Sequence, residues 1–284
     1  MKKIGFIDYF LDEWHANNYP AWIAAPREGE AYTVAYAWAA MDKPGGLTTE
    51  QWCRKFGVQQ AASQQELIEK SDCIIVLSPD NPEQHEALAE LALRSGKPVY
   101  VDKTFALDLA AAQRMFDLAR QHNTPMYSTS ALRYAAELDW LGDNGIAQGD
   151  VTFVSARGPG HFPNYTIHQL EMIVAAMGPG ARRALATGTQ AAPLVAYEYA
   201  DGRCAVVNHL PEADFSVAIQ AGQGQGTGFA VQSNFWQGFT AALLGFFDTG
   251  KAPVPQAETC AAVAMVEAGI LALQQPGNWV AVKG

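Results

Sequence analysis

Residues 71–130 contain three short apolar runs separated by two longer amphipathic segments. The runs lie near residues 73–77, 98–101 and 125–130. Each run is too short for a helix and is rich in β-branched residues, whereas the segments between them have helical periodicity. The order strand, helix, strand, helix, strand predicts a parallel sheet, which restricts the fold of the N-terminal half more than any other feature of the chain.

Polar residues follow the predicted strands at their carboxyl ends, where open parallel sheets bind ligands. Ser78 follows one strand, and Asp102 and Lys103 follow the next. A partly buried lysine can have a lowered pKa and can transfer protons. Lys103 is therefore a candidate catalytic group, and an ordinary solvated loop lysine is the alternative.

Composition excludes several classes of function. The chain has 284 residues, of which 49% are hydrophobic, and a net charge of −10 without a basic run, so neither nucleic acid nor an anionic membrane is an expected partner. The first apolar run stops at Asp8, too early for a signal peptide, and we expect a cytoplasmic protein. The four cysteines are far apart and predict no metal site.

The segment around Lys103 resembles the Gfo/Idh/MocA oxidoreductase family. That family has a Thr-Pro turn and a later Glu-Lys-Pro, which read Ser78-Pro79 and Asp102-Lys103-Thr104 here. The resemblance implies NAD or NADP as cofactor. It also implies a Lys103 that polarises or protonates a substrate oxygen. The positions that it assigns to the cofactor in this segment are Ser78, Pro79, Asn81 and Asp102.

The first turn departs from the family. A glycine-rich turn normally lets pyrophosphate approach the N-terminus of the following helix, but the three glycine positions are Asp8, Phe10 and Glu13. These side chains would obstruct the backbone, and the carboxylates would repel phosphate. Asp8 and Phe10 therefore belong either to a remodelled cofactor or ligand loop or to an acidic surface loop. Asp42, after the predicted strand 33–39, is a candidate for the ribose hydroxyls or an ordinary turn residue.

The second half predicts a mainly antiparallel sheet and contains a second catalytic candidate. Asn164, His168 and Glu171 resemble a family motif of Asp, His and Asp with the same spacing, so His168 is expected to take or give a proton. Thr166 and Gln169 have the spacing of a capping box, which predicts a helix that starts at Thr166 and has His168 in its first turn. Asn164 cannot carry charge and would orient the substrate. His161 is a weaker alternative, and Arg133 could pair with a substrate oxygen or with a carboxylate. The predicted strands are residues 151–157, 192–199, 204–209, 215–220 and 228–232.

We therefore expect an α/β fold with two domains, a Rossmann-like doubly wound domain over residues 1–130 and a C-terminal α+β domain with an open sheet over residues 131–284. The expected function is hydride transfer between nicotinamide and a hydroxyl-bearing carbon of a sugar, a polyol or a similar small molecule. The alternative is a non-redox small-molecule sensor that has lost dinucleotide binding. By resemblance alone, a homo-oligomer is expected through the C-terminal sheet.

Overall fold

The structure is a computed structural model that describes residues 1–284, except for the side chain of Gln223. Its internal contacts divide the chain into two compact units. Unit 1 consists of Met1–Ala106, Ala110–Ser128 and Thr240–Pro255, and unit 2 consists of Leu107–Leu109, Thr129–Phe239 and Gln256–Gly284.

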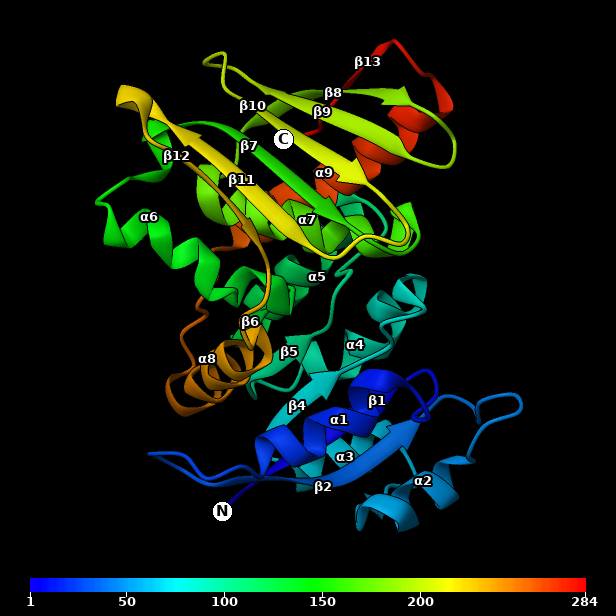
Figure 1. Ribbon diagram of the computed structural model, residues 1–284. Coiled ribbons are helices and arrows are strands. Elements are labelled where there is room, and N and C mark those ends of the chain that lie inside the picture. Colours follow the sequence, from blue (N-terminus) through cyan, green and yellow to red (C-terminus); the bar gives the residue numbers. More distant parts are fainter. The chain divides into compact units, whose positions relative to one another are not determined.

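Unit 1 is built on a six-stranded sheet with the order β3-β2-β1-β4-β5-β6, in which every neighbouring pair is parallel (Figure 1). This is the strand order of a doubly wound dinucleotide-binding fold, so the predicted fold class is confirmed for this half. The strands are β1 Lys2–Asp8, β2 Tyr32–Ala39, β3 Gln59–Gln60, β4 Cys73–Val76, β5 Val99–Val101 and β6 Met126–Tyr127. The helices are α1 Trp14–Ile23, α2 Thr49–Phe56, α3 Gln64–Lys70, α4 His85–Leu93, α5 Leu109–Gln121 and α8 Phe235–Thr249, of which α5 and α8 cross a unit boundary.

The central strands are continuous apolar runs because the sheet is covered on both faces. All four residues of β4 and all three of β5 are buried, and Ile74, Ile75 and Val76 have no exposed surface. Helix α2 begins at the predicted capping box, in which Thr48 and Gln51 each bond the other's backbone amide.

Unit 2 contains a seven-stranded sheet with the order β12-β11-β7-β10-β9-β8-β13, antiparallel except for the β10–β7 pair. Helices α7 and α9 pack on one face and lie behind the sheet in Figure 1. The strands are β7 Val151–Gly158, β8 Ala181–Gly188, β9 Pro193–Tyr199, β10 Cys204–His209, β11 Ser216–Ala221, β12 Gly226–Ala230 and β13 Trp279–Ala281. The mainly antiparallel second sheet is confirmed, and β8 is a strand that the sequence analysis missed.

The helical segments of unit 2 include the core helix α9, Gln256–Gln274. By length and composition α9 could cross a membrane, but 56% of its apolar window is buried inside the protein, as in a core helix. Helix α7 spans Phe162–Met177, and its N-cap position is His161. The expected start at Thr166 is therefore wrong, because the helix begins one turn earlier, with Pro163 in its first turn. The shorter elements are η1 Pro82–Gln84 in unit 1 and, in unit 2, η2 Ala131–Tyr134, η3 Ala136–Asp139, α6 Trp140–Asp143, η4 Gln148–Asp150 and η5 Gly222–Gly224.

Candidate active site

Three neighbouring strands of unit 1, β1, β4 and β5, end at the same edge of the sheet. Asp8 is the last residue of β1, Ser78 follows β4 closely, and Asp102 and Lys103 follow β5. The Asp102 amide donates to the Val76 carbonyl at 2.9 Å and extends the pairing of β5 with β4 to this edge. The sheet therefore gathers several predicted site residues, far apart in sequence, at one edge.

The turn after β1 is closed by a side chain of the chain itself. Glu13 is the N-cap of α1, and its carboxylate accepts hydrogen bonds from the backbone amides of His15, at 2.6 Å, and Ala16. Only 3% of Glu13 is exposed. In a dinucleotide-binding unit the amides of this first helical turn bind the pyrophosphate. The turn therefore does not fit a dinucleotide in the ordinary position.

Asp8 adds a second buried carboxyl at this edge. Its Oδ1 accepts from the Tyr9 amide at 2.7 Å, and its buried Oδ2 has no hydrogen-bond partner among the described side chains and backbone groups. Burial, and then the neighbouring carboxylates of Glu13 and Asp102, raise the pKa of Asp8 well above its ordinary value. Burial raises the pKa of Glu13 to about 8, although its two amide hydrogen bonds act in the opposite direction. The first turn thus holds two buried carboxyls that resist ionisation.

A histidine of α1 is joined to the end of β5. His15 Nδ1 bonds Asp102 Oδ2, and the Tyr100 hydroxyl donates to Asp102 Oδ1 at 3.1 Å. The Tyr19 ring stacks on the imidazole with a centroid distance of 5.2 Å. Although burial alone would raise the pKa of Asp102, the His15 imidazole and the Lys103 ammonium lower it to about 2, which keeps this carboxylate ionised.

His15 was not identified by the sequence analysis. The available signal was its position just after the turn that follows the first strand, at the edge where functional groups of a parallel sheet collect. Its pairing with a residue 87 positions away could not be read from local spacing.

Lys103 lies beside the turn that follows β4. Its side chain is largely buried, with 9% of the residue exposed, and Nζ approaches the Pro79 carbonyl at 3.5 Å. The turn is closed by the Ser78 hydroxyl, which donates to the Asn81 carbonyl at 3.1 Å. Ser78 has a φ of 80°, a left-handed conformation that is uncommon for a residue with a side chain and that concentrates at functional sites. The structure therefore brings together Lys103, Ser78, Pro79 and Asn81, four predicted site residues.

The other predicted cofactor contacts have structural partners. Asp42 Oδ1 accepts from the amide of Thr49 at 2.6 Å and from its hydroxyl at 2.8 Å, which secures the start of α2. The Phe10 ring lies below the Lys43 ammonium, with 5.4 Å from Nζ to the ring centroid. Neither contact excludes a ligand, and cofactor contacts for Asp42 and Phe10 remain predictions.

In unit 2, His168 is oriented by a hydroxyl. Ser130 Oγ and His168 Nδ1 are 2.6 Å apart, and the ring lies edge-on to Phe215 and Tyr165. The expectation that His168 lies in the first turn of its helix is wrong, because α7 begins at Phe162 and places His168 in the second turn. The effect of a helix N-terminus falls off within the first turn, so the ring is oriented by Ser130 rather than by the helix end.

Arg133 forms the carboxylate pairing that the sequence allowed. It donates to Glu171 Oε2 at 3.1 Å and to Glu258 Oε2. Burial raises the pKa of Glu171, even though Arg133 and the Thr129 hydroxyl favour its ionised form. Glu171 is thus a structural partner of Arg133, three residues after His168 in α7.

Asn164 and His161 lie at the start of α7. Asn164 is partly exposed, and its backbone N–H donates to the His161 carbonyl at 3.0 Å. His161 lines a cavity of about 740 Å³ together with the buried His209, a volume typical of small-molecule pockets. The residues that line this cavity do not include His168. Among the described residues no cluster of His, Cys, Asp and Glu is suited to hold a metal ion.

Comparison with protein families gives one match. Residues 20–129 match the GFO_IDH_MocA model, described as an oxidoreductase family with an NAD-binding Rossmann fold. The match confirms the family resemblance predicted from the sequence, and the nicotinamide cofactor expected from that resemblance agrees with the family's description. The matched segment begins after the turn that contains Asp8 and Glu13. A comparison with curated proteins found no match.

Solved structures share the fold over the whole chain. A probable dehydrogenase from Thermotoga maritima has a TM-score of 0.78 at 17% identity, with 99% of this chain and 98% of that chain covered. The Lactobacillus casei myo-inositol dehydrogenase, solved with NAD(H) and myo-inositol, has a TM-score of 0.79 at 16% identity, with 100% and 97% covered. GenD2 from gentamicin A biosynthesis, solved with NAD, has a TM-score of 0.80 at 13% identity, again with 100% and 97% covered. Identities this low show the shared fold alone.

Proposed function

We propose that the chain, whose residues 20–129 match the model of the Gfo/Idh/MocA oxidoreductase family, transfers a hydride between a nicotinamide cofactor and a hydroxyl-bearing carbon of a sugar or polyol. The observation that carries the proposal is Lys103 at the carboxyl end of β5, buried beside the Ser78–Asn81 turn. A buried ammonium at the edge of a parallel sheet can polarise a substrate oxygen more effectively than a solvated one.

Each half of the chain contributes a proton-handling group to this proposal. Lys103 polarises or protonates the substrate oxygen, and His168 takes or gives the proton of the hydroxyl group. Ser130 orients the His168 imidazole through Nδ1. Asn164, uncharged and partly exposed at the start of α7, orients the substrate by hydrogen bonding.

The cofactor supplies the hydride chemistry when it is bound. The residues of this chain available to hold it are the Ser78–Asn81 turn, from which Ser78, Pro79 and Asn81 would contact it, with Asp102 at the end of β5 and Asp42 after β2. The first turn does not fit the pyrophosphate in its ordinary position, so the proposal assigns this turn no role in the reaction.

We further propose a cytoplasmic protein that forms homo-oligomers through the sheet of unit 2.

A non-redox function is a second candidate, favoured by one specific observation. The Glu13 carboxylate accepts hydrogen bonds from the helix amides that would otherwise bind the pyrophosphate of a dinucleotide. A binding protein that retained the crevice, but not the dinucleotide, would recognise a small polar molecule at the same edge of the sheet.

Cofactor titration and a Lys103 variant test the proposal. We expect nicotinamide fluorescence to reveal saturable NADH or NADPH binding. We also expect turnover with a panel of sugars and polyols that includes myo-inositol. Lys103→Met should lower kcat by about 10²- to 10⁴-fold, the usual contribution of a proton-transfer group, with an unchanged circular dichroism spectrum. The exposed Lys251→Met variant serves as the matched control.

The two candidates give different results in this experiment. The absence of cofactor binding at millimolar concentration, together with no turnover, would reject the oxidoreductase and leave the binding protein. A kcat in Lys103→Met equal to that of the wild type would remove Lys103 from the mechanism.

A further inference from the structure

We propose that the N-terminus of α1 is an anion site filled by the chain itself, with the Glu13 carboxylate in the place that a dinucleotide's pyrophosphate takes in this fold. Any dinucleotide that the protein binds is then held without α1. The inference concerns only the first turn, and it stands whether or not the protein transfers a hydride.

The hydrogen bonds of Glu13 use the backbone amides that a helix N-terminus offers to a bound anion. Both carboxylate oxygens are used, Oε2 by the His15 amide at 2.6 Å and Oε1 by the Ala16 amide. These first-turn amides have no partner within the helix, and the helix dipole favours negative charge beside them. A phosphate oxygen would have to displace the carboxylate to reach them.

Glu13 is buried, unlike an ordinary helix-capping residue at the protein surface. The residue is 3% exposed, and Leu11, two positions earlier in the same turn, is 2% exposed. The turn is therefore packed, and the side chain cannot move into solvent without opening it. This observation decides against the acidic surface loop that the sequence left open.

Asp8 provides a second and independent obstacle. Its unpartnered Oδ2 is buried at the end of β1, where a glycine would let a phosphate approach the backbone. A phosphate at this position would meet the Asp8 side chain instead of bare backbone, and its negative charge would further disfavour ionisation of this buried carboxyl.

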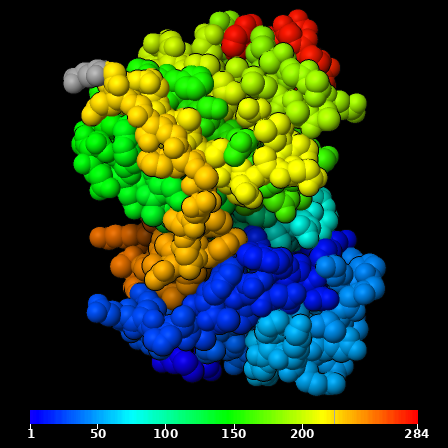
Figure 2. Space-filling model, in the orientation of Figure 1, coloured from blue at the N-terminus to red at the C-terminus, as the bar shows by residue number. Residues whose placement is uncertain are grey.

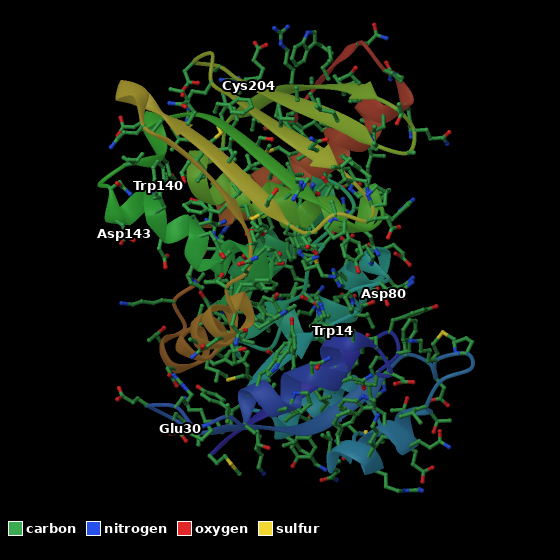
Figure 3. The ribbon with its side chains drawn as sticks, in the orientation of Figure 1. Trp14, Glu30, Asp80, Trp140, Asp143 and Cys204 are labelled. Atoms are coloured by element: carbon green, nitrogen blue, oxygen red, sulfur yellow. The ribbon has the colours of Figure 1, made fainter. Side chains whose placement is uncertain are left out.

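The pairing of His15 with Asp102 also lies at this edge of the sheet. His15 belongs to the first turn of α1, and Asp102 follows β5, with β4 between β1 and β5 in the sheet. Their side-chain contact therefore spans the carboxyl end of β4. Groups of this chain hold the start of α1 to the sheet edge at a place where a glycine-rich turn leaves room for a ligand. Trp14, which begins α1 and is labelled in Figure 3, is exposed, and α1 lies at the surface of unit 1 (Figure 2).

Rebuilding the glycine turn tests the inference with NADH as the probe. The variant Asp8→Gly/Phe10→Gly/Glu13→Gly restores the fingerprint spacing, and Glu13→Gly alone frees the two amides with a smaller change. We expect NADH to bind the triple variant at least tenfold more tightly than the wild type and to bind Glu13→Gly at least threefold more tightly. Glu50→Gln, which removes a carboxylate from the first turn of α2, should leave the affinity unchanged.

The outcomes separate this inference from the proposed function. If the triple variant does not fold, as judged by circular dichroism, Glu13→Gly decides the result. NADH affinity in the folded variants that is equal to or weaker than in the wild type overturns the inference, whatever the turnover. Tighter binding in the variants supports it, even where the wild type shows no turnover and the oxidoreductase proposal fails.

Discussion

Both units bury carboxyl groups, but the groups that bond to these carboxyls differ between the units. In unit 2, the Arg133 guanidinium pairs with Glu171 and Glu258, so two acidic side chains share one permanent cation. In unit 1, the hydrogen bonds described for Asp8 and Glu13 come from backbone amides. Burial raises the pKa in both places, for Glu171 in unit 2 and for Asp8 and Glu13 in unit 1.

This difference separates a structural cluster from a remodelled ligand site. Guanidinium pairing is the usual way to stabilise charge inside a protein, because the cation cannot lose its proton. Backbone amides at a helix N-terminus are the usual way to bind an external anion, and Glu13 now occupies them. Unit 1 thus keeps the binding geometry of its fold but fills it with its own side chain.

Removing the shared cation should destabilise unit 2 strongly. Arg133→Met leaves Glu171 and Glu258 buried without their partner, which typically costs about 3–5 kcal/mol. Urea denaturation at pH 7 measures the loss, with the exposed Arg182→Met as control, expected within about 0.5 kcal/mol of the wild type. A cost below about 1 kcal/mol for Arg133→Met would mean that Arg133 is not essential to this cluster.

Asp102→Asn tests the ion pair at the edge of unit 1. The pKa of Asp102 is lowered to about 2 in the folded protein, against about 3.9 in an unfolded chain. A lowered pKa contributes stability that is present above pH 4 and lost as the pH falls towards 2. We expect Asp102→Asn to cost about 2–3 kcal/mol at pH 7 and progressively less below pH 4. Urea denaturation curves at pH 7 and at pH 3 check this expectation. An equal loss of stability at the two pH values would rule out the ion pair as the source of the loss.

Glu13→Gln should change the pH dependence of stability in the direction opposite to that of Asp102→Asn. Its pKa is raised to about 8 in the fold, so this group contributes stability that is complete below its unfolded pKa of about 4.3 and is lost as the pH rises through 8. Glutamine keeps an acceptor for the helix amides but does not ionise. We expect the variant to lose less stability than the wild type between pH 6 and pH 9, by at least about 1.4 kcal/mol, the equivalent of one pKa unit. Parallel pH profiles would show that Glu13 is already ionised and solvated at pH 6.

Local sequence patterns were sufficient for most of unit 1. Strands β4 and β5 were predictable because a strand buried on both faces must be apolar throughout, and the placement of Lys103 at the sheet edge followed from that. The start of α7 was missed because the spacing of Thr166 and Gln169 imitates a capping box inside a helix that begins at Phe162. Strand β8 was missed because two arginines interrupt its apolar residues.

The contacts that define the sites could not be predicted from local patterns. His15 meets Asp102 across 87 residues, and Ser130 meets His168 across 38. The segment Thr240–Pro255 joins unit 1 although it follows most of unit 2 in the chain, and Asp248 within it bonds Arg27 at 2.8 Å. Hydrophobic periodicity does not predict such pairings, because it indicates only which face of a single helix or strand is buried.

The parallel sheet, the residues at its carboxyl edge and the lack of glycine at positions 8, 10 and 13 follow from the amino-acid sequence, since they depend on side-chain type and local spacing alone. The groups that take the place of the missing glycines follow from the packing of the folded chain. Whether a carboxylate faces solvent or caps a buried helix depends on how α1 packs against the ends of β1 and β5, and that packing places Glu13 on the amides and His15 on Asp102.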